Sequence, residues 1–316
     1  MKSVAETVNQ ITDWQPPVIP EDIVHGDMPG DKVDITREHV QKANIIFREL
    51  LPKLAEASEK SDTGKVVITV CGGSGVGKSE IASLLAFYLK KAGIGSYTLS
   101  GDNYPHRIPV YNDAERLRIF RESALQGMVR EGVFTADCFT VIHGLQEKND
   151  DANRTHIGEY GWYEVYLRNG KEGLKRYLGS NDEIGFDEVE KIVREFKAGS
   201  DEIWLKRMGR KDTELWYEKV DFSGVQVLVI EWTHGNSDNY RGVDIPVLLN
   251  STPRETLAHR RARKRDGATD SLFTMMVLEI EQEMLEQQAS KAKIIISKRG
   301  ELLSYGSYCR QMEEGR

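Results

Sequence analysis

The residues from Gly72 to Ser79 form a glycine-rich loop with the composition of a phosphate-binding site. They read Gly-Gly-Ser-Gly-Val-Gly-Lys-Ser, which matches the pattern G-x-x-x-x-G-K-[ST]. The glycines allow backbone N–H groups to turn toward phosphate oxygens at the positive end of a following helix. Lys78 is suited to neutralise phosphate charge and the Ser79 hydroxyl to bind Mg²⁺. A glycine-rich turn without a ligand is the alternative interpretation. The loop residues predicted to bind a nucleotide are Gly72, Gly73, Ser74, Gly75, Val76, Gly77, Lys78 and Ser79.

Two carboxylates follow predicted strands. Asp102 comes after the strand at 96–100, and Glu231 follows the apolar run at 225–230. Ligands bind at the carboxyl edge of a parallel sheet, so both side chains are expected near the glycine loop. Asp102 could accept the proton of an attacking hydroxyl. Glu231 could hold a water on Mg²⁺ or position the acceptor. The alternatives are an ordinary turn for Asp102 and a solvated loop acid for Glu231.

A cationic stretch from His259 to Asp266 contains five lysine and arginine residues. Such a run is usually a solvated helix face. Its place after a strand and a helix start at Thr252 favours a lid that closes over a triphosphate. In that interpretation Arg260 and Arg263 bind ATP, whereas Arg261 and Arg265 stabilise the charge that develops during transfer. Nucleic-acid binding lacks support, because the net charge is -7 and no aromatic recognition motif occurs.

The segment after Asp102 supplies candidates for contact with the acceptor. His106 and Arg107, with Arg116 and Arg118 nearby, could contact an anionic or polyhydroxylated molecule, although surface charge is the alternative for each singly. No histidine, cysteine and carboxylate set has metal-binding spacing. The residues predicted to bind the acceptor are Asp102, Tyr104, His106 and Arg107.

The order of elements predicts the frame that positions these residues. Buried strands at 65–70, 96–100, 225–230, 245–250 and 293–297 alternate with helical patterns. This alternation predicts an α/β fold of the P-loop NTPase type, with a parallel sheet flanked by helices and an inserted acceptor or lid region. Residues 1–64 are expected to be an extended arm and a helix that Pro52 interrupts. Residues 65–316 then form the catalytic domain, with an insertion at about 126–183.

Composition limits the class of protein. Of the 316 residues 39% are hydrophobic and 29% are charged, which is typical of a soluble globular protein. Three cysteines without metal-type spacing suggest a reducing compartment. The start lacks an apolar signal segment, and no run approaches the roughly 18 apolar residues of a membrane span. A cytoplasmic protein without a membrane or nucleic-acid partner is expected, and a homodimer is a possible assembly.

Together these motifs resemble the phosphoribulokinase/uridine kinase family of P-loop kinases. The resemblance rests on the glycine loop, Gly101-Asp102-Asn103-Tyr104, Glu231 and the arginines at 260–265, and it covers roughly residues 65–125 and 184–300. It implies that Asp102 is the base and that the arginines close on ATP. The chain departs from the family where Trp232 follows Glu231 in place of the usual glycine, at 126–183, and in its first 64 residues. The identity of the acceptor therefore does not carry over.

The leading hypothesis is an ATP- and Mg²⁺-dependent kinase that phosphorylates a hydroxyl of a small metabolite such as a nucleoside, sugar or sugar phosphate. The alternative is a nucleotide-dependent switch or regulatory ATPase that acts on a protein partner. A GTPase switch should contain Asn-Lys-x-Asp, which this sequence lacks. A member of the fold that binds nucleotide without catalysis is disfavoured by the presence of Lys78, Ser79 and Asp102.

Overall fold

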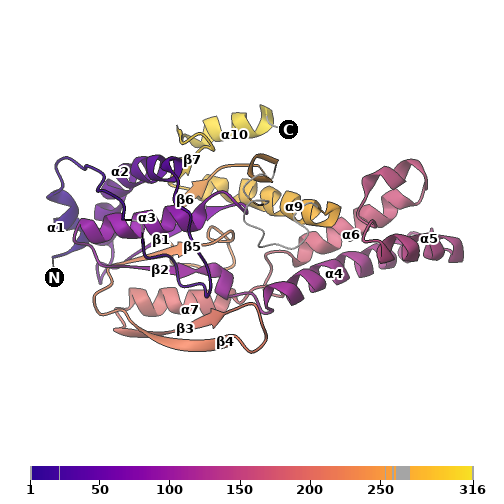
Figure 1. Cartoon of the computed structure of the whole chain (residues 1–316), viewed down its shortest axis with the longest axis horizontal. Coiled ribbons are helices and arrows are strands. Elements are labelled where there is room, and N and C mark those ends of the chain that lie inside the picture. The colour runs from indigo at the N-terminus through magenta and orange to yellow at the C-terminus, as the bar shows by residue number, and fades with distance from the viewer. Residues whose placement is uncertain (1, 21, 253, 258–259, 261–270, 315–316) are drawn as a thin grey trace.

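The centre of the molecule is a mostly parallel β-sheet flanked by helices (Figure 1). The computed structural model describes residues 2–20, 22–252, 254–257, 260 and 271–314. In this part the sheet has the strand order β2-β5-β1-β6-β7-β8, and only the pairing of β7 with β8 is antiparallel. The predicted α/β class is therefore confirmed. The strands are β1 (Val66–Gly72), β2 (Ser96–Ser100), β5 (Val227–Glu231), β6 (Ile245–Leu249), β7 (Ile294–Ile296) and β8 (Leu302–Leu303).

The register of the sheet brings the predicted site residues to one edge. Glu231 at the end of β5 pairs with Val70 of β1 on one side and with Ser100 of β2 on the other. The glycine loop follows β1 and leads into α3 (Lys78–Lys91), while β2 continues into the short 3-10 helix η1 (Gly101–Asn103). The carboxyl ends of these three strands therefore meet, as the apolar runs predicted.

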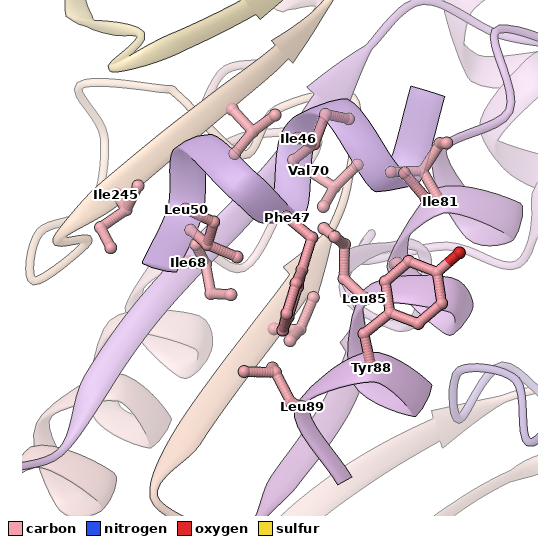
Figure 2. Packing of buried hydrophobic residues seen from close by; sticks show 14 of the residues in the cluster. Ile46, Phe47, Leu50, Ile68, Val70, Ile81, Leu85, Tyr88, Leu89 and Ile245 are labelled. Carbon is pink, nitrogen blue, oxygen red and sulfur yellow. The ribbon is translucent and has the colours of Figure 1, made fainter. Parts of the chain in front are cut away.

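One face of the sheet is covered by α3 and by α2 (Arg37–Lys60). Figure 2 shows Phe47 of α2 and Tyr88 of α3 packed over Val70 of β1. The prediction that Pro52 interrupts the first helix is wrong, because α2 runs through it. Pro52 is exposed, and residues before and after it bury the apolar face. This burial outweighs the cost of a proline within a helix, which is about 3 kcal/mol.

The opposite face of the sheet is covered by α7 (Phe186–Lys197) and an antiparallel ribbon of β3 (Glu202–Met208) and β4 (Leu215–Asp221). The sequence pattern does not predict this ribbon. Its tryptophans and tyrosine lie among charged residues, so they lack the continuous apolar run of the central strands. On this face Phe186 and Trp232 pack together in the core.

A helical region extends from the carboxyl edge away from the sheet (Figure 1). It consists of α4 (Pro109–Arg130), α5 (Ala136–Glu147), α6 (Tyr163–Tyr177) and part of α9 (Leu272–Gln288), which share a core of their own. The predicted insertion at 126–183 falls mostly within this region, and its outer boundaries stay a prediction. The remaining helices are α1 (Val4–Asn9), η2 (Arg154–Gly158), η3 (Ala289–Lys291) and α10 (Tyr305–Glu314). None of the described helices has the length and apolar character needed to cross a membrane.

Candidate active site

The glycine loop links β1 to α3 in a conformation that requires glycine. Gly75 and Gly77 have φ values of 76° and 96°, in the left-handed region that other residues rarely adopt. A Cβ atom on Gly75 would lie 2.9 Å from Cγ of Arg260, and one on Gly77 would lie 2.8 Å from Nε2 of His39. Both the backbone conformation and the close neighbours therefore exclude a larger residue at these positions.

The loop places Lys78 and Ser79 in the first turn of α3, where backbone N–H groups attract anions. Nζ of Lys78 donates a hydrogen bond to the carbonyl oxygen of Gly73, at 3.1 Å. The hydroxyl of Ser79 donates to Oε2 of Glu231, at 3.2 Å. Glu231, which was predicted only to lie at the same edge of the sheet as the loop, therefore contacts the loop serine across 152 residues of sequence.

Glu231 is buried at the centre of this edge. Its Oε1 accepts a hydrogen bond from the hydroxyl of Ser100, at 2.7 Å. Burial raises the pKa of Glu231 to about 8, and the negative charge of Asp102 adds to this rise while Lys78 opposes it. Carboxylate and hydroxyl oxygens are ligands that Mg²⁺ prefers, usually together with phosphate oxygens and water. The oxygens of Ser79 and Glu231 therefore fit a magnesium ion. Within the described residues no three histidine, cysteine or acidic side chains form a metal-binding group.

Asp102 lies in η1, directly after β2, and its side chain is exposed. Its negative charge adds to the effect of burial in raising the pKa values of both Glu231 and Glu281. Lys78 lowers the pKa of the same two carboxylates. A carboxylate at this edge of the sheet could accept the proton of an incoming hydroxyl, and the assignment of Asp102 as the base stays a prediction.

The predicted lid is described only in part. Arg260 is buried, and it donates from NH1 to Oγ1 of Thr256, at 2.6 Å. Arg260 and Thr256 line a hollow together with Gly73, Ser74 and Glu281. This arrangement places one predicted ATP-binding arginine against the glycine loop. Arg261, Arg263 and Arg265 lie outside the described residues, so their predicted roles stay predictions.

Three residues predicted to bind the acceptor have other contacts. Tyr104 is fully buried in the core beneath β2 and β5, which does not favour contact with a ligand. His106 is exposed, and its Nε2 lies 2.9 Å from the carbonyl oxygen of Asn181. Arg107 donates to the hydroxyl of Tyr177, at 3.0 Å. These contacts hold the segment after η1 against the helical region, and a direct role in binding the acceptor stays a prediction.

A buried polar cluster on the helical side was not identified from the sequence. Arg116 of α4 contacts Glu183 at 2.6 Å and Glu281 of α9 at 3.6 Å. Glu183 also accepts the backbone N–H of Gly179, at 2.6 Å. Arg116 had been noted only as a nearby cation. Its partners lie 67 and 165 residues further along the chain, and no local pattern connects them.

The electrostatics of this cluster depend on burial and on its charged neighbours. Burial acts to raise the pKa of Glu183, but the charge of Arg116 and the backbone hydrogen bond from Gly179 together lower it, so Glu183 stays a carboxylate. Burial raises the pKa of Glu281, while Arg116 and Lys78 oppose the rise. Burial also lowers the pKa of His234 to about 4, so its imidazole is neutral. Glu281 joins this cluster to the phosphate side of the site, because it lines the same hollow as Gly73 and Ser74.

The chain is similar in sequence to one curated protein and similar in outline to solved structures. No family model matches the chain. The chain is 38% identical over 251 residues, or 79% of its length, to the bifunctional alpha-galactosidase/sucrose kinase AgaSK of Mediterraneibacter gnavus. It spans only 22% of the length of that relative.

Two solved structures are similar in outline. A D-glycerate 3-kinase from Cryptococcus neoformans has 11% identity and a TM-score of 0.48, with 83% of this chain and 97% of that chain covered. A possible uridine kinase from Bacillus stearothermophilus has 16% identity and a TM-score of 0.35, with 78% and 98% covered. At these scores the fold assignment depends on the strand order and the glycine loop described above.

Proposed function

We propose that this chain is an ATP-dependent kinase that transfers the γ-phosphoryl group to a hydroxyl of a small saccharide. The observation that carries the proposal is the meeting of Lys78, Ser79, Glu231 and Asp102 at the carboxyl ends of β1, β5 and β2. The sucrose kinase activity in the name of the 38% identical relative supports a sugar as the acceptor. Sucrose is therefore the first acceptor to test.

The proposed reaction uses few protein groups. The acceptor hydroxyl gives its proton to a carboxylate oxygen of Asp102, and its oxygen forms a bond to the γ-phosphorus of ATP. The bond between the γ-phosphorus and the β,γ-bridging oxygen then breaks, and ADP leaves. Lys78 neutralises charge on the phosphates throughout the transfer. A bound Mg²⁺, held by Ser79 and by Glu231 directly or through water, would supply further positive charge to the phosphate oxygens.

The helical side provides a wall suited to an uncharged acceptor. The guanidinium of Arg116 is already paired with Glu183 and Glu281. With Asp102 there are three carboxylates against the two cations Arg116 and Lys78, and Lys78 is assigned to the phosphates of ATP, so an anionic acceptor would meet repulsion there. Carboxylate oxygens accept hydrogen bonds from sugar hydroxyls, and such charge-assisted bonds are strong. We therefore propose that Glu281 contacts the acceptor, and that a neutral sugar is preferred over a sugar phosphate.

We also propose that the chain acts in the cytoplasm. The three cysteines are free, which supports a reducing compartment such as the cytoplasm. A homodimer stays a prediction, and sedimentation of the purified chain would test it.

The test is a panel of acceptors with purified chain, ATP and Mg²⁺, in which ADP formation is measured. Sucrose, fructose, glucose, fructose 6-phosphate, uridine and glycerate cover neutral sugars, an anionic sugar, a nucleoside and a hydroxy acid. The proposal expects ADP formation that rises with a neutral sugar and that is absent in Lys78→Ala. Stimulation by fructose 6-phosphate or uridine alone would refute the saccharide assignment. If no acceptor stimulates ATP use, the switch acting on a protein partner becomes the better hypothesis.

A further inference from the structure

Asp27, in the arm that precedes α2, has a mostly buried carboxylate with four hydrogen-bond donors. Its Oδ1 accepts from the backbone N–H of Ser100 at 2.7 Å and from Nδ2 of Asn103 at 3.1 Å. Its Oδ2 accepts from the hydroxyl of Tyr97 at 2.9 Å and from NH1 of Arg207 at 2.8 Å. One side chain from the arm therefore joins β2, η1 and β3. Buried carboxylates are retained at such sites only when they are paired and hydrogen-bonded in this way.

The two partners of Oδ1 enclose Asp102 in the sequence. Ser100 ends β2 and Asn103 ends η1, so Asp27 fixes the backbone on both sides of the proposed base. Asn103 is held from its other side as well, because its Oδ1 accepts the backbone N–H of Met208 at 3.0 Å. The side chain of Asp102 itself is exposed. The backbone of η1 sets the point from which this side chain extends, and Asp27 holds that backbone through Ser100 and Asn103.

The arm also lies against the other two parts of the site. A Cβ atom on Gly26 would lie 3.4 Å from Cγ2 of Thr98 and 3.9 Å from Cγ of Glu231. Further along, His39 at the start of α2 contacts Gly77 of the glycine loop. Gly26 and Asp27 of the arm therefore lie against β2 and close to Glu231, and α2, which follows the arm, lies against the phosphate loop.

We propose that Asp27 is a positioning residue for phosphoryl transfer, which holds η1 so that the carboxylate of Asp102 faces the acceptor hydroxyl. This inference rests on the proposed function, because it needs Asp102 to act as the base. It assigns a role in catalysis to the arm, which lies outside the part of the chain that carries the kinase motifs. Small displacements of a reacting group are costly, since about 1 Å can lower a rate by roughly 100-fold.

The kinetic test uses Asp27→Asn, which keeps the shape of the side chain. The asparagine amide keeps one oxygen that accepts hydrogen bonds and replaces the other with an NH₂ group that donates. The NH₂ group faces either Ser100 and Asn103 or Tyr97 and Arg207, and the hydrogen bonds to that pair are lost. We expect kcat to fall by about 10- to 100-fold, with the KM for ATP changed less than about twofold. The matched control is Asp22→Asn, an exposed aspartate of the same arm, which should keep wild-type kinetics.

A double-mutant cycle distinguishes positioning from general stability. If Asp27 acts through Asp102, then Asp27→Asn lowers kcat by less than about twofold in a chain that already carries Asp102→Asn. An equal loss in both backgrounds would refute the positioning role, and so would a wild-type kcat in Asp27→Asn. If Asp27→Asn does not fold, Asn103→Ala replaces it, because it removes the bond to η1 and leaves the pair of Asp27 with Arg207. The same dependence on Asp102 is expected.

Hydrogen exchange of the backbone amides provides a measurement that does not need an acceptor. In Asp27→Asn the amide of Ser100 loses its partner or has a weaker one, so exchange in residues 99–104 should accelerate by at least about tenfold while β1 is unchanged. Unchanged exchange in these residues would refute the inference. If the wild-type chain phosphorylates no sugar but this acceleration occurs, the proposed function fails while the structural role of Asp27 stands.

Discussion

The donor side and the acceptor side of this site are built in different ways. The donor side consists of the glycine loop at 72–79 and Glu231, and most of its residues are consecutive in the sequence. The proposed acceptor side consists of Arg116, Glu183, His234 and Glu281, which come from α4, two loops and α9. A nucleoside triphosphate presents the same phosphates in every protein that binds it, so a short backbone motif is sufficient for the donor side. The acceptor side must fit one molecule, so its residues are brought together by tertiary packing.

This difference predicts that substitutions on the donor side abolish turnover, whereas those on the acceptor side change the affinity for the sugar. The largest effect is expected for Lys78→Ala. Removal of the charge that neutralises the phosphates should lower kcat by more than about 10³-fold. Lys90→Ala, at an exposed position near the end of the same helix, is the matched control and should be as active as wild type. A Lys78→Ala chain that retains a tenth of the activity would show that the loop is not the phosphate site.

Asp102→Asn should have the next largest effect. Loss of a general base lowers kcat by about 10²- to 10⁴-fold, while the binding of ATP should be nearly unchanged because Asp102 is not part of the phosphate-binding loop. Steady-state kinetics and equilibrium titration with ATP measure the two quantities separately. Asp182→Asn replaces an exposed aspartate in the turn before α7 and serves as the control. Normal turnover in Asp102→Asn would refute the assignment of the base.

The donor side was the more predictable of the two for a physical reason. The pairing of Ser79 with Glu231 follows from the rule that parallel strands end at a common edge, so strand prediction was sufficient to expect it. Arg116 of α4 and Glu281 of α9 meet through tertiary packing, which no periodicity in either helix indicates. The same holds for Asp27, a single aspartate in a segment without a motif. The prediction that α2 is interrupted was wrong because burial of Phe47 and Leu54 outweighs the tendency of Pro52 to break a helix.

Glu281→Gln tests the acceptor side at the point where it approaches the donor side. The substitution removes the negative charge that pairs with Arg116 and weakens the proposed hydrogen bond to the sugar. We expect the KM for the sugar to rise by about tenfold, with the KM for ATP changed less than about twofold. Glu279→Gln changes an acid two residues away on α9 that pairs with Arg154 at 2.6 Å, and it should leave both constants unchanged. A rise in the KM for ATP instead would place Glu281 on the donor side.

His234 is expected to give the smallest effect, seen in stability at acid pH. Its pKa in the folded chain is about 4, against 6.5 for the unfolded chain. Below pH 6.5 the unfolded chain therefore binds a proton that the folded chain does not, and stability is lost as the pH falls toward 4. Between pH 7 and 4.5, wild type should lose roughly 1–3 kcal/mol more than His234→Gln. Urea unfolding at several pH values measures this difference.

The control for this prediction is His106→Gln, because His106 is exposed. Its unfolding curves should follow those of wild type at each pH. Carboxyls such as Glu231 and Glu281 have raised pKa values and an opposite dependence on pH. Both carboxyls are present in wild type and in His234→Gln, so their contribution cancels when the unfolding free energies of the two chains are subtracted. If the free energy of unfolding changes with pH in the same way for wild type and His234→Gln, then His234 titrates normally and the cluster is open to water.

The most direct test of the central claim is to follow the γ-phosphoryl group itself. Wild-type chain is incubated with ATP labelled in the γ-phosphate, Mg²⁺ and sucrose, and the products are separated. We predict that the label appears in a phosphorylated sugar, that little appears as inorganic phosphate, and that Asp102→Asn forms almost none of the labelled sugar. Label found only in inorganic phosphate, at a rate that sucrose does not change, would contradict the assignment of a sugar kinase.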